Sequence, residues 1–145
     1  MADAPLKLVA GDAEDLASLS ALLQDAVLKV GDIAWLPKAR RFACVLNRYR
    51  WEAGRAGGRG ERVRAGLHVE GVTRAEVARI RQGARDAVLS LLAVTFEGAA
   101  DGPGAVLLSF SGGGAVRLHV EALEVRLDDL TTAWAAKARP QHDLG

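Results

Sequence analysis

Strict alternation of apolar and polar side chains is the feature of this sequence that most limits its fold. In residues 62–70 every second side chain is apolar, and the same period recurs in residues 105–111 and 116–121. Successive side chains of a β-strand point to opposite faces, so this period predicts strands with one buried face. Glycines 112–114 separate the last two runs and readily adopt the positive φ of a tight reversal. Residues 105–121 are therefore predicted to form a hairpin.

Other runs rich in apolar residues predict further strands, at residues 6–10, 27–36, 41–51 and 88–96. The second and third runs flank Pro37, which favours a turn, and so predict another hairpin. Residues 88–96 are almost continuously apolar, which predicts a central strand covered on both faces.

Two segments leave the type of element open. Residues 72–82 fit either a helical or a strand period, and a return strand around residues 75–81 is favoured. Residues 122–130 fit either a last strand or a terminal helix.

One amphipathic helix is predicted at residues 13–25. Its leucines recur at helical spacing, at Leu16, Leu19, Leu22 and Leu23. Asp12 is a suitable N-cap, because its carboxylate can accept a backbone N–H of the first turn. The leucine face is expected to pack against the sheet.

These elements predict one α+β domain spanning residues 1–145, a length that suits a single domain. The short connections favour antiparallel neighbours, in a sheet or small barrel of about seven strands. A pleckstrin-homology-like barrel is one architecture of this kind. A C-terminal helix is a further option, and residues 137–145 are expected to form a frayed tail.

The composition indicates a cytoplasmic protein without a membrane segment. No apolar run approaches the roughly 18 residues of a membrane span, and the N-terminus lacks the apolar stretch of a signal peptide.

Cys44 is the one cysteine, so it cannot form an internal disulfide. Its apolar neighbours indicate a packed thiol rather than a nucleophile.

Several segments together resemble a known family. They are GDIAWLPK at residues 31–38, RRFACVLNRYRWE at 40–52, RVRAGLH at 62–68, DDL at 128–130, and Trp134. With these segments the chain resembles the bacterial family called domain of unknown function 2948, over nearly its whole length. The resemblance implies a small bacterial cytoplasmic protein. It supplies no activity and no catalytic residues.

The tetrapeptide Leu-His-Val-Glu occurs twice, with His68 and Glu70 in the first copy and His119 and Glu121 in the second. Alternation places each His and Glu on the same outward face. On neighbouring strands, the four side chains could hold zinc or iron, or act as a general base. Polar residues on a solvated face explain both copies equally well.

A basic and aromatic group is the second candidate site. Residues 38–85 contain Lys38 and twelve arginines against four glutamates. The candidate polyanion-binding residues are Arg48, Arg50, Arg62 and Arg64, near Tyr49 and Trp51. Arginine can contact phosphates while aromatic rings stack on bases. A GC-rich coding sequence, which fills surface positions with arginine, explains the same bias.

Signatures of common enzymes are absent from the sequence, including the Walker loop, the Gly-x-Ser-x-Gly elbow and His-Glu-x-x-His. We therefore predict a non-catalytic interaction or scaffold domain, without a cofactor. Its expected partner is another protein, or a second copy bound through a sheet edge or apolar face. A metal-binding protein or enzyme that uses the two His/Glu pairs is the alternative. A nucleic-acid or polyanion binder is the third reading.

Overall fold

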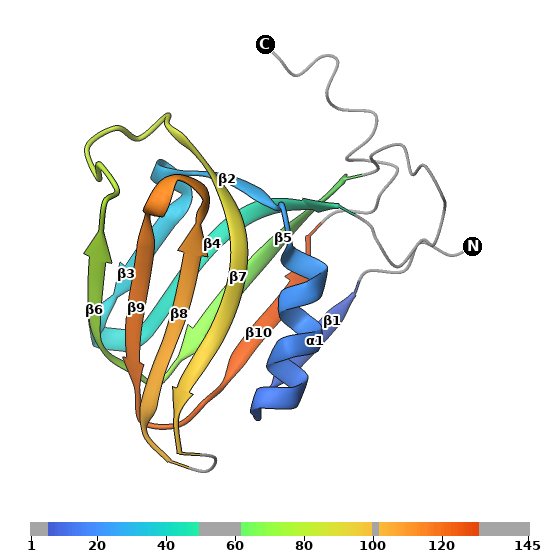
Figure 1. Cartoon of the computed structure of the whole chain (residues 1–145), viewed down its shortest axis with the longest axis vertical. Coiled ribbons are helices and arrows are strands. Elements are labelled where there is room, and N and C mark those ends of the chain that lie inside the picture. Colours follow the sequence, from blue (N-terminus) through green and yellow to red (C-terminus); the bar gives the residue numbers. More distant parts are fainter. Residues whose placement is uncertain (1–5, 50–61, 100–101, 131–145) are drawn as a thin grey trace.

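The computed structural model describes residues 6–49, 62–99 and 102–130. In these residues the chain forms one α-helix and ten strands (Figure 1). The first half contains β1 (Lys7–Ala10), α1 (Ala13–Leu23), β2 (Val27–Lys29), β3 (Ile33–Leu36) and β4 (Arg41–Tyr49). The second half contains β5 (Arg62–Glu70), β6 (Val72–Ala78), β7 (Val88–Gly98), β8 (Gly104–Phe110), β9 (Ala115–Val120) and β10 (Val125–Asp129). Short 3-10 turns lie at η1 (Val30–Asp32), η2 (Pro37–Ala39) and η4 (Ser111–Gly113).

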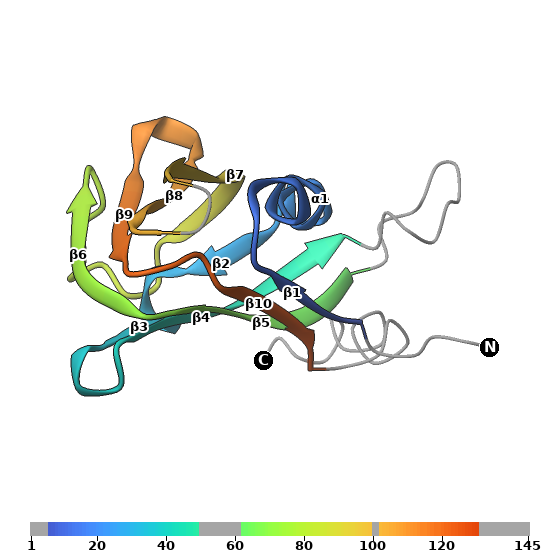
Figure 2. The ribbon, with the colours of Figure 1, turned by 90° about the horizontal axis from the view of Figure 1, so that it is seen from below.

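The strands follow the order β1-β10-β5-β4-β2-β7-β8-β9-β6, and β3 also pairs with β4. Figure 2 shows that the sheet curls into two layers, with β1, β10, β5 and β4 in one and β7, β8 and β9 in the other. The chain crosses from one layer to the other at Gly71, the single residue between β5 and β6. Strand β6 then pairs with β9. Gly71 has φ of +70°, a conformation that side-chain-bearing residues rarely adopt.

Helix α1 packs on the inner side of the curled sheet beside β7 (Figure 2). The Asp12 carboxylate accepts a 2.7 Å hydrogen bond from the Asp15 N–H, as predicted for an N-cap. Leu16, Leu19 and Leu23 are buried. The predicted helix and its leucine face are confirmed, with the last helical residue at Leu23 rather than residue 25.

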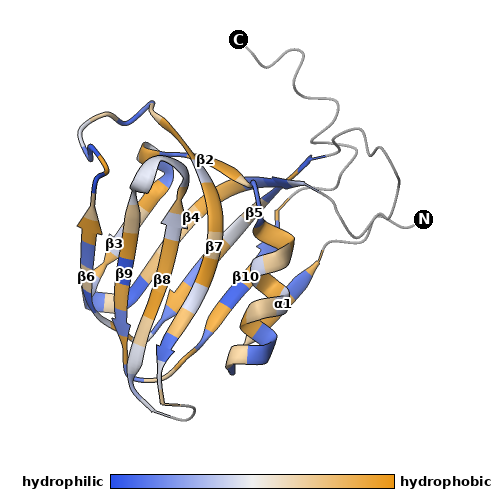
Figure 3. Ribbon diagram, viewed as in Figure 1, coloured by the Kyte–Doolittle hydropathy of each residue, from blue (hydrophilic) through white to orange (hydrophobic). Residues whose placement is uncertain are grey.

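The alternation that predicted the strands is visible in Figure 3 as changes of colour along β9. The inward side chains of β5, β8 and β9 are buried, namely Val63, Ala65, Leu67, Val69, Val106, Leu108, Phe110, Val116, Leu118 and Val120. The α+β class and the antiparallel sheet are confirmed. Residues 72–78 and 125–129 both form strands, which decides the two ambiguous segments.

The expected number of strands, about seven, is wrong, because ten lie in the described residues. One cause is a break in the predicted strand 27–36. There the N–H groups of Val30 and Gly31 donate to the carbonyls of Ala87 and Arg85, at 2.9 and 2.8 Å. These bonds divert the chain into η1 and split the run into β2 and β3.

The expected burial of residues 88–96 on both faces is also wrong. Val88 is 64% exposed and Leu92 is 48% exposed. The pairing of β7 with β8 shifts register between Leu91 and Ala93, which leaves Leu92 at a β-bulge. The suggested C-terminal helix and the frayed tail at residues 137–145 lie outside the described residues.

A buried ion pair joins β4 to β10 and to the residue that precedes β1. Arg48 on β4 reaches across β5 to Asp129 on β10, with Nε and Nη2 each donating to one carboxylate oxygen at 2.9 Å. Side-chain exposure is 1% for Arg48 and 4% for Asp129. The Asp129 Oδ2 atom also accepts from the Leu6 N–H at 2.9 Å. This pair therefore connects β4, β10 and the start of β1.

We expect Arg48→Met to lower the free energy of unfolding by about 3–5 kcal/mol, because it leaves the Asp129 carboxylate buried without its cation. Urea denaturation would measure the loss. Arg126→Met is the matched control, since Arg126 pairs with Glu124 at 2.7 Å but is 48% exposed. Its expected cost is about 0–1 kcal/mol. Equal costs for the two variants would contradict a structural role for the buried pair.

Candidate functional site

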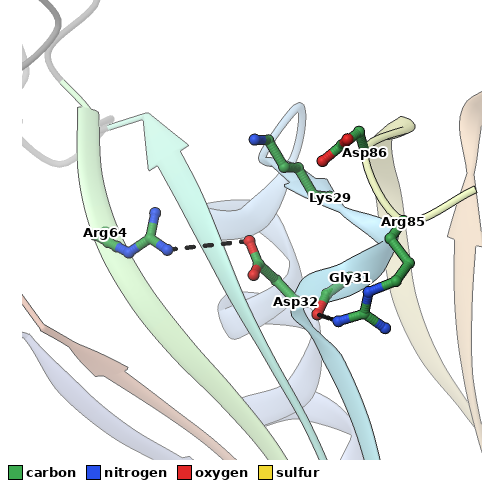
Figure 4. Close-up of a pocket in the computed structure, with 6 residues that line it drawn as sticks. All are labelled: Lys29, Gly31, Asp32, Arg64, Arg85 and Asp86. Atoms are coloured by element: carbon green, nitrogen blue, oxygen red, sulfur yellow. Dashed lines mark hydrogen bonds and ion pairs between the residues drawn. The ribbon is translucent and has the colours of Figure 1, made fainter. Parts of the chain in front are cut away.

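An open polar cavity of about 360 Å³ lies where three distant segments of the chain meet. It is lined by Lys29, Gly31, Asp32, Arg64, Arg85 and Asp86 (Figure 4). These residues come from β2 and η1, from β5, and from the connection between β6 and β7. All the side chains that line it are charged, so the cavity suits a charged ligand rather than an apolar one.

Backbone contacts hold this cavity in shape. The N–H of Gly31 donates to the carbonyl of Arg85 at 2.8 Å, and Nη2 of Arg85 donates back to the carbonyl of Gly31 at 3.2 Å. A Cβ atom at position 31 would lie 3.1 Å from that Arg85 carbonyl oxygen. Glycine therefore permits the close approach that brings Arg85 to the cavity.

Cations outnumber carboxylates in the lining. The cations are Lys29, Arg64 and Arg85, and the carboxylates are Asp32 and Asp86 (Figure 4). The Arg64 Nη2 atom lies 4.0 Å from the Asp32 Oδ2 atom, and both side chains are partly exposed. Guanidinium groups bind carboxylate and phosphate oxygens through forked N–H donors. An anionic group entering the cavity could therefore compete with Asp32 for Arg64.

The four predicted polyanion-binding residues do not form one site. Arg48 is buried in its pair with Asp129 rather than at the surface. Arg50 lies outside the described residues. The Arg62 guanidinium sits 4.7 Å from the centre of the Tyr49 ring and donates to the Tyr49 hydroxyl at 2.8 Å. Of the three that the structure describes, Arg64 alone lines the cavity.

Sequence reasoning missed Lys29 and Arg85 as partners of Arg64. Lys29 follows an apolar run, and Arg85 lies in a segment without a clear period. Their proximity depends on the hydrogen bonds between η1 and the β6–β7 connection. The one sequence feature that indicated this region was the concentration of arginines in residues 38–85. It did not predict which of these residues line the cavity.

The two His/Glu pairs do not lie on neighbouring strands. His68 is on β5, which pairs with β4 and β10, whereas His119 is on β9, which pairs with β8 and β6. The strand adjacency that the metal hypothesis needs is therefore not met. Within residues 6–49, 62–99 and 102–130, no three His, Cys, Asp or Glu side chains are grouped to hold a metal ion.

Three members of these pairs have polar partners that lie outside the pairs. Glu70 pairs with Arg41 at 2.9 Å and Glu121 with Arg40 at 3.0 Å. The His119 Nε2 atom lies 2.9 Å from Glu76 Oε1. This hydrogen bond holds the pKa of the Glu76 carboxyl below its usual value. Ordinary surface contacts therefore account for these side chains.

These features define a class of protein: an α+β domain with a curled antiparallel sheet, one packed helix and a polar surface cavity. In the described part of the chain, no helix has the length and apolar character needed to cross a membrane. The chain belongs to the family described as "Protein of unknown function (DUF2948)", whose model matches residues 6–142. This confirms the resemblance found in the sequence. No curated protein and no solved structure matches the chain.

The single cysteine is placed in the core. Cys44 is buried, and burial, with a smaller contribution from the Asp32 charge, raises the pKa of its thiol to about 12. The thiolate is the reactive form of cysteine, so this thiol is not a nucleophile near neutral pH in the folded protein.

We expect Cys44 to react with a disulfide reagent at pH 8 at least about 100-fold more slowly than free cysteine, because the folded protein keeps the thiol protonated and covered. Absorbance of the released thiolate would measure the rate. In concentrated urea the rate should rise to that of an ordinary thiol. Fast reaction of the folded protein would place Cys44 at an accessible site instead.

Proposed function

We propose that this protein is a non-catalytic interaction domain that holds an acidic segment of a partner protein at the cavity of Lys29, Arg64 and Arg85. The observation that supports this most is that three cationic side chains, from three separate segments, line one open cavity. Arg79 and Arg81 belong to the same β6–β7 connection and are exposed.

The long contact between Arg64 and Asp32 supports the same proposal. It measures 4.0 Å, whereas the pair of Arg41 and Glu70 measures 2.9 Å. Exposed ion pairs contribute little to stability, so exchange of one carboxylate for another has a small cost.

A protein partner fits this cavity better than a nucleic acid does. Asp32 and Asp86 interrupt the positive lining, so the fixed spacing of a continuous phosphate backbone would place some phosphates beside carboxylates. The nearby Tyr49 ring is covered on one face by Arg62, which reduces its use as a stacking platform for bases. Separate carboxylates of a peptide can instead be placed beside individual cations.

A bacterial cytoplasmic setting is part of this proposal, and a buried, free Cys44 is compatible with it. The pleckstrin-homology-like barrel also stays a prediction. It would suit a binding module, but architecture alone does not assign function.

We expect the protein to bind a fluorescently labelled polyglutamate peptide at low salt, with affinity that falls as salt screens the charges. In the double variant Arg64→Ala/Arg85→Ala, the dissociation constant should rise at least about tenfold, equivalent to about 1.4 kcal/mol. Fluorescence anisotropy titration would measure both effects.

The matched control is Arg117→Ala/Arg126→Ala, which removes the same charge from arginines that do not line the cavity. It should leave the affinity within about twofold. Equal weakening by both double variants would show that only net charge matters and would reject the cavity. Tighter binding of mixed-sequence RNA than of the peptide would favour the nucleic-acid reading.

A further inference from the structure

Strand β6 lies at one end of the sheet order, and of the described strands only β9 pairs with it (Figure 1). Among the described residues, the backbone bond recorded on its other side is the one from Val72 N–H to the Arg40 carbonyl, at its first residue. Most side chains of the strand are exposed, and the apolar Val77 is 41% exposed. An unpaired strand edge is a template for another strand.

The sequence of β6 is complementary to itself when two copies run antiparallel. The strand spans Val72–Ala78, so its middle residue is Ala75. A two-fold axis at Ala75 places Arg74 of one copy opposite Glu76 of the other, and the reverse contact follows by symmetry. Both side chains lie on one face of the strand and are exposed, at 66% and 42%. Opposite charges directly across an antiparallel pair attract each other.

The other end of the sheet lacks this property. Strand β1 is four residues long, and self-pairing about its centre would place Lys7 opposite Ala10. A short edge strand with a lysine is a common protection against pairing. Only β6, of these two edges, combines sufficient length with a self-complementary order of charges.

We propose that two copies of this chain associate through β6, with the strands antiparallel about a two-fold axis at Ala75. The layer of β7, β8, β9 and β6 then continues into the same layer of the second copy. Each Arg74 pairs with Glu76 of the second copy, in place of or in addition to its present 2.7 Å contact with its own Glu76. The surface is isologous, so the assembly closes as a dimer.

Sedimentation of the full chain over a range of concentrations tests this proposal with the charge reversals Arg74→Glu and Glu76→Arg. In a dimer of either variant, two contacts between like charges replace the two Arg–Glu contacts. Each variant alone should therefore dimerise about tenfold more weakly than the original chain, equivalent to about 1.4 kcal/mol. An equimolar mixture should recover dimers. In the mixed dimer the two substituted residues have opposite charges and face each other, and the unchanged Arg74 faces the unchanged Glu76.

Recovery on mixing also excludes misfolding, because an unfolded variant could not regain affinity from its counterpart. Arg126→Glu is the matched control: Arg126 pairs with Glu124 two residues away at 2.7 Å, but on β10, which has neighbours on both sides. It should leave dimerisation unchanged. A monomer at all concentrations, no recovery in the mixture, or equal weakening by Arg126→Glu would each overturn the proposal.

Discussion

The buried pair of Arg48 and Asp129 is the polar constraint on which the rest of this sheet depends. Bidentate hydrogen bonds and the additional Leu6 N–H leave neither charge without a partner in a region that excludes water. Because a buried charge without its partner is very costly, the ends of β4 and β10 must take up one register relative to each other. That register also places the outward residues of β5, including Arg64, at the surface.

Several charges on the outer faces are neutralised by a close neighbour. Arg117 bonds to Glu97 at 2.8 Å and Arg126 to Glu124 at 2.7 Å. At the cavity, however, the three cations of the lining exceed its two carboxylates. An anionic ligand gains most where charges of one sign exceed the other in a concave surface. For this reason the cavity is a better binding candidate than the arginine-rich segment as a whole.

The two proposals concern different parts of the molecule and different physical forces. The cavity uses charge, and its affinity must depend on ionic strength. The proposed β6 contact uses backbone hydrogen bonds, and the two Arg74–Glu76 contacts set the register and add to the affinity. The family match extends over residues 6–142 and so includes both regions, but it brings no activity with it.

By itself, the sequence determined the local structure and the buried faces. Period two placed Leu67 and Leu118 in the core, and helical spacing placed Leu16 and Leu19 against the sheet, since burial of apolar side chains follows from local geometry. The sequence predicted Arg48 to bind a polyanion, and only the tertiary structure shows it buried beside a partner 81 residues away. Beyond the two predicted hairpins, tertiary structure alone decided which strands are neighbours, and so it separated His68 from His119 and brought Arg64 and Arg85 to one cavity. The physical reason is that strand order depends on long-range packing and backbone hydrogen bonds, which leave no periodic signal in the sequence.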